Sequence, residues 1–275
     1  MQQCGLVDSH LHLQDFEPGT DIGAVIEQAA AAGVTQLICN GAREADWPKV
    51  QSFAKSYPEV VPCFGVHPWF VTSASADWLS ALDMLVKSTA CGVGEIGLDR
   101  NRQPFDKAAL EEAFRLQLDI ARRYDCPAMI HCVRSWGWMM DVLRSENPLQ
   151  HGFLMHAYGG SADLVAELVE MGAYISFSGK ALEPNYARAR KALQAVPPGR
   201  LLIETDAPCM VPPEEFRAYR MTASDGEEMN HPANLPLILR GIAGLLGQPA
   251  DELRAQLWEN ARRFFGPILK DTHDG

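Results

Sequence analysis

Short runs of apolar and β-branched residues alternate with longer amphipathic stretches along the chain. This alternation is typical of a parallel sheet covered by helices. Eight such runs can be counted, and each one precedes a stretch with helical spacing or a loop. They are GLVDSH (5–10), TQLICNG (35–41), VVPCFGVH (60–67), ACGVGEIG (90–97), PAMIHC (127–132), GFLMHAY (152–158), AYISFSG (173–179) and RLLIETD (200–206).

The amphipathic stretches predict helices between these runs. One covers 21–33 and closes at Gly33, and a longer one covers 106–124. Two further helices, near 232–246 and 250–265, complete the chain. Glycine just past the last periodic residue is a common helix stop.

Eight strands with intervening helices in 275 residues predict an α/β fold, a (β/α)8 TIM barrel. No Gly-x-Gly-x-x-Gly follows the first run, which argues against an open doubly wound sheet. The chain has no internal repeat, low-complexity tract or linker. We therefore expect residues 1–275 to form a single domain.

The segment 209–230 is the longest part of the chain without clear periodicity. Pro212, Pro213 and Gly226 mark it as a loop. Five acidic residues and two arginines give it a formal charge of −3 (five minus two). A loop of this length is either a lid or binding element, or a solvated surface excursion, and the sequence favours neither.

Composition narrows the classes of protein. Hydrophobic residues make up 47% and charged residues 21%, as in ordinary soluble proteins. No apolar stretch is long enough to cross a bilayer, and the N-terminus lacks a basic region followed by an apolar core. We expect a cytoplasmic protein with no membrane partner, and nothing indicates its oligomeric state.

The net charge of −11 counts against a dedicated nucleic-acid binder, because such a field repels polyanions. It does not exclude an enzyme whose metal ions meet phosphate locally. The seven cysteines contain no C-x-x-C pair, and most lie in apolar runs, so we interpret them as small core residues. Cys209 differs, because it directly follows the last strand motif.

The first predicted strand ends in His10-Leu11-His12. Strand alternation sends both imidazoles to one side and Leu11 to the other. That geometry suits two ligands on one metal ion. The motif alone also fits two solvated loop histidines.

Other predicted strands also end in histidine: the third at His67, the fifth at His131 and the sixth at His156. In barrels of this type the chemistry collects at the C-terminal ends of the strands. A single buried histidine is more often a hydrogen-bonded core residue than a ligand. Four strands that deliver histidine at the same end are hard to explain by packing.

Carboxylates join the histidines at Glu95 and Asp206. Each one alone fits a capping or salt-bridged residue, but burial without a partner is costly and metal coordination is a common compensation. We predict two divalent metal ions bridged by Glu95, with Zn, Mn or Mg as candidates. Asp8, one strand period before His10, is expected to orient an imidazole.

Eight short motifs follow one another along the chain in this order: VDSHLHL, GVHPW, GEIGLD, CPAMIHC, LMHAYGGS, LLIETDAP, NHPAN and NARRFFG. This ordered set resembles the TatD family of metal-dependent hydrolases, and the similarity runs from about residue 6 to 266. The resemblance implies a barrel with two divalent ions and phosphodiester hydrolysis of DNA. It implies that one ion is held by His10, His12, Glu95 and Asp206, the other by Glu95, His131 and His156, with His67 near the scissile phosphate.

This chain departs from the family pattern at three places. Arg134 stands three residues after His131, where members often have arginine two residues on. The sixth strand motif reads HAYGG instead of the common His-Cys-Phe-Ser-Gly, and SDGEEM replaces an often basic segment before NHP. The acidic segment favours a substrate other than a polyanion, although it leaves the metal ligands intact.

Three hypotheses for the function follow. The first is a phosphodiesterase or deoxyribonuclease in which Asp206 orients or deprotonates the attacking water, while His67 and Arg134 bind the substrate and neutralise phosphate oxygens. The second is a metal-dependent hydrolase of amide, ester or lactone bonds, including aminoacyl esters. The third is a metal-dependent scaffold without catalysis, against which the complete ligand set argues.

Four aromatic residues lie just after predicted strand ends. They could stack on nucleic-acid bases or other flat groups, or pack beneath the loops. Packing is the more frequent arrangement for large aromatic side chains. The four are Trp69, Trp136, Trp138 and Tyr158.

Overall fold

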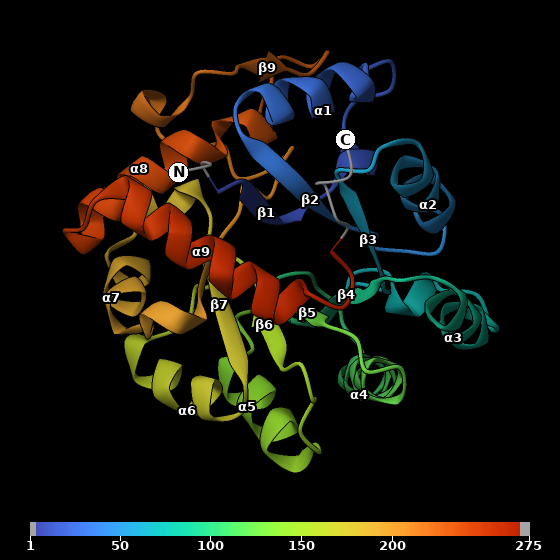
Figure 1. The fold of residues 1–275 in the computed structure, drawn as a ribbon. Helices are drawn as coiled ribbons and strands as arrows, with labels where there is room; N and C mark the ends of the chain where they lie inside the picture. Colours follow the sequence, from blue (N-terminus) through green and yellow to red (C-terminus); the bar gives the residue numbers. More distant parts are fainter. Residues whose placement is uncertain (1–3, 270–275) are drawn as a thin grey trace.

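In the computed structural model, which describes residues 4–269, eight parallel strands form one sheet whose spatial order follows the chain from β1 to β8 (Figure 1). Each strand pairs with the next in parallel register, as the sequence pattern predicts. The strands are β1 (Leu6–Leu11), β2 (Val34–Asn40), β3 (Val60–Phe64), β4 (Gly92–Asp99), β5 (Ala128–Val133), β6 (Phe153–Met155), β7 (Ala173–Phe177) and β8 (Leu201–Ile203).

Hydrogen bonds between β1 and the chain at and after β8 close the sheet into a barrel. The hydroxyl of Ser9 donates to the carbonyl of Ile203 at 2.9 Å. The backbone N–H of Asp206 donates to the carbonyl of His10 at 3.0 Å, and that of His12 donates to the carbonyl of Ala207 at 2.8 Å. The closure lies at the end of β1 that carries the two histidines.

Helices surround the barrel (Figure 1), and they include the four that the sequence predicts. Carboxylates cap two of them, since Asp21 accepts from Ala24 N and Asp106 from Ala109 N, both at 3.1 Å. None of the helices within 4–269 is long and apolar enough to cross a membrane. The helices are α1 (Ile22–Ala31), α2 (Trp47–Ser56), α3 (Trp78–Ser88), α4 (Lys107–Arg123), α5 (Trp136–Ser145), α6 (Val165–Glu170), α7 (Ala187–Ala195), α8 (Leu235–Leu246) and α9 (Ala250–Phe265).

The apolar core has two parts. A large cluster fills the layer between strands and helices, and a smaller one fills the inside of the barrel. The inner cluster joins strand residues such as Ile38 and Met129 to Phe264 and Phe265 of α9. Helix α9 runs across the barrel in Figure 1, and its two phenylalanines are fully buried there.

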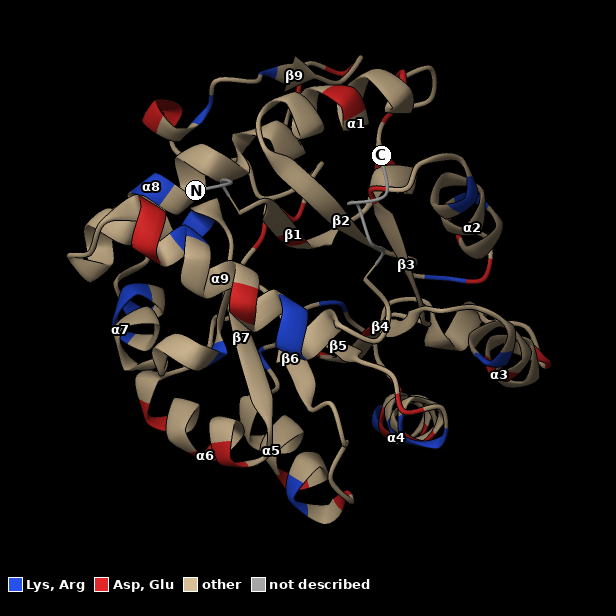
Figure 2. Cartoon of the chain, viewed as in Figure 1, with Lys and Arg blue, Asp and Glu red and all other residues tan. Residues whose placement is uncertain are grey.

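Five of the seven cysteines are buried, in agreement with their interpretation as core residues, whereas Cys209 is exposed. Charged residues gather on the outer helices and loops and leave most of the strand surface uncharged (Figure 2). The histidines and carboxylates at the strand ends are therefore unusual, because the rest of the barrel interior is apolar. They lie at the end away from Phe264 and Phe265.

The segment 209–230 is largely irregular, as predicted, and it also contains a short hairpin of β9 (Met221–Thr222) and β10 (Glu228–Met229). Arg217 forms ion pairs with Glu214 at 2.9 Å and with Glu228 at 2.5 Å. Arg220 also pairs with Glu214. Part of the negative charge of this loop is thus neutralised within the loop itself.

Candidate metal centre

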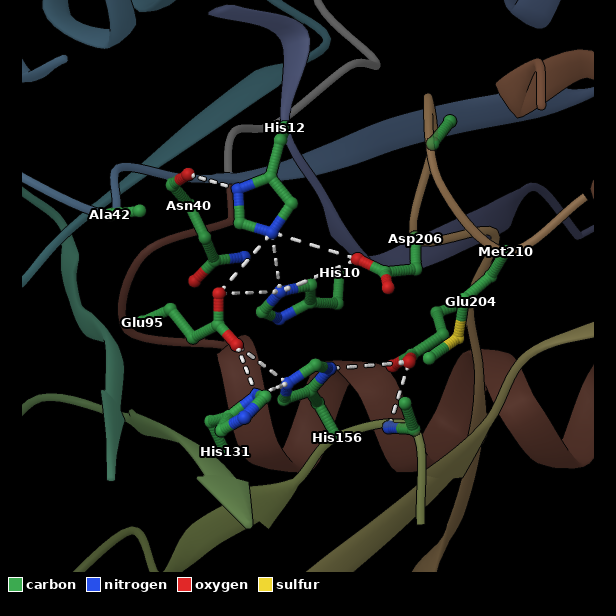
Figure 3. A network of polar contacts seen from close by, with 12 residues as sticks. His10, His12, Asn40, Ala42, Glu95, His131, His156, Glu204, Asp206 and Met210 are labelled. Carbon is green, nitrogen blue, oxygen red and sulfur yellow. Dashed lines mark hydrogen bonds and ion pairs between the residues drawn. The ribbon is translucent and has the colours of Figure 1, made fainter. Parts of the chain in front are cut away.

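Strand β1 places two imidazoles side by side. The Nε2 atoms of His10 and His12 lie 3.1 Å apart, while Leu11 between them is buried in the outer apolar cluster. This is the alternation expected of a strand. Both nitrogens point to the space enclosed by the strand ends (Figure 3).

Glu95 of β4 lies between two groups of imidazoles, and its two oxygens face different groups (Figure 3). Oε2 lies 3.3 Å from Nε2 of His12 and 3.7 Å from Nε2 of His10. Oε1 lies 2.8 Å from Nδ1 of His131 and 2.8 Å from Nε2 of His156. One carboxylate therefore connects both halves of the site.

Asp206 completes the first group. Its Oδ1 lies 3.6 Å from Nε2 of His12 and 3.9 Å from Nε2 of His10. Four donors placed tetrahedrally around a zinc-sized ion, at about 2.1 Å from it, lie about 3.4 Å from one another. The donor spacings in this group are close to that value, so the residues fit a divalent metal ion.

The far nitrogens of three histidines face oxygen acceptors. Nδ1 of His12 lies 2.7 Å from the carbonyl oxygen of Asn40, and Nε2 of His131 lies 3.1 Å from Oδ2 of Asp99. Nδ1 of His156 faces Oε1 of Glu204 at 3.5 Å. In His12 and His131 the hydrogen bond to the far nitrogen places the proton there and leaves the near nitrogen as a metal donor, whereas the 3.5 Å separation in His156 is an ion-pair distance without a hydrogen bond.

His67 has the opposite arrangement. Its Nδ1 accepts the backbone N–H of Trp69 at 3.1 Å, so in the neutral ring the proton is on Nε2. Burial lowers the pKa of His67 to about 3, which keeps the ring neutral. Its Nε2 lies 3.6 Å from Oε1 of Glu95. This histidine is thus built to donate a hydrogen bond into the site.

Burial and charge act in opposite directions on the carboxylates. Burial raises the pKa of Asp206 to about 7. Burial would also raise the pKa of Glu95, but the positive charge of His156 and the hydrogen bonds from His10 and His12 outweigh it and hold that pKa well below its usual range. Burial lowers the pKa of His10 to about 4. Glu95 is therefore the anionic centre of the cluster.

The structure corrects one expectation and adds two residues. Asp8 does not orient an imidazole: its Oδ1 accepts from Thr205 N at 2.9 Å and its Oδ2 accepts from the Thr205 hydroxyl at 2.5 Å. Asp8 instead fixes the chain next to Asp206. The residues that face imidazoles are Asp99 and Glu204, which end β4 and follow β8. Asp99 lies in the motif GEIGLD and Glu204 in LLIETDAP. Their burial indicates that each needs a polar partner, but the sequence alone does not show that they are buried.

A cleft of about 370 Å³ opens over the candidate metal ligands. Trp69 lines it, together with His67, Asn101 and Cys209. Arg134 is exposed and is not among the residues that line the cleft.

The other three aromatic residues pack beneath the loops. Tyr158 is buried, with its hydroxyl donating to the carbonyl of Ser161 at 2.8 Å. Trp136 and Trp138 are half-buried and pack against the outer apolar cluster. Stacking on a ligand in the cleft thus remains open only to Trp69 among the four.

A closed (β/α)8 barrel with imidazoles and carboxylates converging at the C-terminal ends of its strands defines a metal-dependent hydrolase. The family model described as TatD related DNase matches residues 7–266, and the chain belongs to this family. The resemblance seen in the motifs is thereby confirmed. Of the residues that the resemblance assigns to the two ions, the four imidazoles lie within 3.7 Å of Glu95, and Asp206 lies within 3.9 Å of His10 and His12. Donor atoms of His67, Glu95 and His131 also lie within 4.8 Å of one another, so His67 belongs to the same cluster.

Two relatives illustrate the match. The chain is 32% identical to the 3'-5' ssDNA/RNA exonuclease TatD of Citrobacter rodentium, over 97% of this chain and 100% of the relative. It is 29% identical to the uncharacterized metal-dependent hydrolase YabD of Bacillus subtilis, over 94% of this chain and 98% of the relative.

Solved structures agree with the barrel. The crystal structure of YJJV, a TatD homolog from Escherichia coli, superposes with a TM-score of 0.86 at 26% identity and covers 96% of this chain and 98% of that one. A TatD family hydrolase from Entamoeba histolytica shows the same fold at 20% identity and a TM-score of 0.82, over 97% of this chain and 100% of that one.

Proposed function

We propose that this protein is a two-metal phosphodiesterase that cleaves single-stranded nucleic acid, with DNA as the first candidate. The observation that carries the proposal is Glu95, whose two oxygens face two separate groups of metal donors. A bridging carboxylate of this kind is what a two-metal site requires. The name of the Citrobacter relative, an exonuclease for single-stranded DNA and RNA, supports the choice of substrate.

In this proposal the first ion is held by His10, His12, Glu95 and Asp206, and the second by Glu95, His131 and His156. Such ions, when bound, lower the pKa of water and neutralise charge on phosphate oxygens. Imidazole-rich donors suit Zn or Mn, whereas Mg prefers more oxygen. The orientation of His12 and His131 by hydrogen-bond acceptors at their far nitrogens supports this assignment.

The protein's own groups would act as follows. Asp206 orients the attacking water and accepts its proton as a new P–O bond forms and the P–O bond to the leaving group breaks. The Nε2–H of His67 donates to a non-bridging oxygen, where negative charge develops. Arg134, at the exposed start of the β5–α5 loop, remains a candidate contact for phosphate outside the cleft.

The acidic segment 209–230 does not argue strongly against a polyanionic substrate. Of this segment, only Cys209 and Met210 line the cleft. Its two arginines are paired with Glu214 and Glu228 on the outside. An action in the cytoplasm stays a prediction from the sequence.

The test is a hydrolysis assay with a 5′-labelled single-stranded DNA, the same sequence as RNA, and panels of amides, esters and lactones. We expect cleavage of the oligonucleotides, and its loss in Glu95→Ala and in Asp206→Asn while circular dichroism stays unchanged. Glu227→Gln, which removes an exposed acid that does not line the cleft, is the control and keeps full activity. Cleavage of the amide or ester panel alone, or unchanged rates in both variants, would refute the proposal.

A further inference from the structure

Trp69 stands out among the exposed apolar side chains. Three large hydrophobic residues within 4–269 are exposed, and Trp69 is exposed at 44%. The other two, Met84 and Tyr186, do not line the cleft, whereas Trp69 does. An indole that is left open to solvent beside a catalytic cleft has no packing function that would explain its exposure.

The indole is held in place from the side of the metal ligands. Its Nε1–H donates to Oδ2 of Asp99 at 2.7 Å, the same oxygen that faces Nε2 of His131. Its backbone N–H donates to Nδ1 of His67 at 3.1 Å, and the two rings meet edge to face at 5.0 Å. These contacts fix the ring while much of it stays accessible. A fixed aromatic surface binds a flat partner with little loss of conformational entropy.

The loop between β4 and α4 adds positive charge next to this ring. The guanidinium of Arg102 lies 5.5 Å from the centroid of the Trp69 ring. Arg100, two residues earlier, lies 6.0 Å from the ring of Phe105. Both arginines are exposed, and neither forms an ion pair with an acidic side chain in the described part of the chain.

An aromatic surface with unpaired arginine beside it matches the chemistry of single-stranded nucleic acid. Bases stack on aromatic side chains, while arginine contacts the backbone or the ring itself. An aliphatic ligand would gain from the indole but not from the arginines. A simple phosphate would gain from the arginines but not from the indole. A nucleotide is the ligand that uses both features.

We propose that Trp69 forms a stacking subsite for a nucleobase next to the scissile phosphate, with Arg102 beside it for the flanking phosphate. This subsite deepens the proposed function, on which it rests for the choice of ligand. It assigns recognition of the base to the β3–α3 loop and recognition of the scissile phosphate to the metal centre. The enzyme then reads a base by its flat face, without selecting one sequence.

The test compares binding of thymidine 5′-monophosphate with that of 2-deoxyribose 5-phosphate, which carries a hydroxyl in place of the base. Calorimetric titration of the metal-loaded protein is expected to show about tenfold tighter binding of the nucleotide, in line with base stacking on aromatic residues. Trp69→Ala should bring the two dissociation constants to within about twofold. Tyr186→Ala removes a similarly exposed aromatic residue outside the cleft and should leave the ratio unchanged.

Trp69→Phe separates stacking from positioning, because phenylalanine keeps a ring but lacks the N–H that Asp99 accepts. If the subsite is real, this variant retains most of the preference for the nucleotide and binds the sugar phosphate normally. An equal loss for both ligands in Trp69→Ala and Trp69→Phe would overturn the inference, since it would place the effect on Asp99 and His131. Equal wild-type affinities, or no binding of either ligand, would also overturn it. Failure of the proposed function is distinguishable, because it would appear as intact binding without hydrolysis of any oligonucleotide.

Discussion

Oδ2 of Asp99 accepts from Nε2 of His131 at 3.1 Å, on the side of the ring that faces away from Glu95. The carboxylate thereby fixes which nitrogen of His131 carries the proton and where the ring points. Carboxylates behind ligating histidines raise ligand basicity and commonly change metal affinity by 10- to 100-fold when they are replaced. We therefore expect metal binding to depend on Asp99, which contacts His131, as well as on the candidate ligands themselves.

Asp99→Asn is expected to weaken binding of the second metal ion by about 10- to 100-fold, because the amide lacks the charge that orients His131. Competition with a chromophoric chelator measures the affinity. Asp251→Asn, an exposed acid at the start of α9, is the control and should bind metal normally. Equal affinities in Asp99→Asn and wild type would mean that Asp99 does not support a ligand.

His67→Ala and His12→Ala should behave differently, because the two rings carry their protons on opposite sides. His67→Ala is expected to keep the wild-type metal content while kcat/KM falls by about 10²- to 10³-fold, the usual cost of removing one donor to a developing charge. His12→Ala should lose bound metal as well as activity. Elemental analysis beside steady-state kinetics separates them. Loss of metal in His67→Ala would identify His67 as a ligand instead.

Treatment with a chelator should abolish hydrolysis, and Zn or Mn should restore it. Wild-type protein is expected to bind two ions per chain, and Glu95→Gln fewer, because the bridging charge is lost. The apolar clusters inside and outside the barrel contain none of the candidate metal ligands, so the circular dichroism spectrum should survive chelation. Activity that persists in the presence of excess chelator would contradict a metal mechanism.

Phe264→Ala should destabilise the protein by about 3–5 kcal/mol, the typical cost of deleting a buried phenylalanine. Phe264 is fully buried and packs against Tyr174, with ring centroids 4.9 Å apart. The urea midpoint measures the loss, with Arg262→Ala on the exposed face of α9 as control. Metal content without urea should remain normal, because α9 lies at the other end of the barrel. A midpoint equal to that of the control would show that α9 does not support the core.

The sequence predicted the strands well but placed some of their ends too late. The run GFLMHAY predicts a strand over 152–158, whereas β6 covers Phe153–Met155. Ala157 adopts a φ of 42° and Asp206 a φ of 52°, which strands do not allow. Such backbone geometry clusters at functional sites. Residues that are buried at a site continue the apolar pattern of the strand before them. The hydrophobic pattern therefore does not show where the backbone leaves the strand.

The candidate metal ligands were easier to predict from the sequence than the residues that orient them. His10 and His12 lie at the end of β1 and Glu95 lies within β4, all in short motifs, and barrel topology brings these strands together. Barrel topology does not predict which carboxylates contact the imidazole rings from behind. Asp8 and Glu204 are both fully buried carboxylates next to ligand candidates, yet Asp8 bonds Thr205 while Glu204 faces His156. The choice depends on the closure between β1 and β8, which only the three-dimensional arrangement settles.

Phe264 and Phe265 plug the barrel at the end opposite the metal centre. Whatever binds at the strand ends therefore has to arrive and depart through one mouth, past Trp69. A cleaved fragment that lingers there blocks the next molecule of substrate. The product should accordingly inhibit competitively with substrate, and kcat should be limited by the rate of product release.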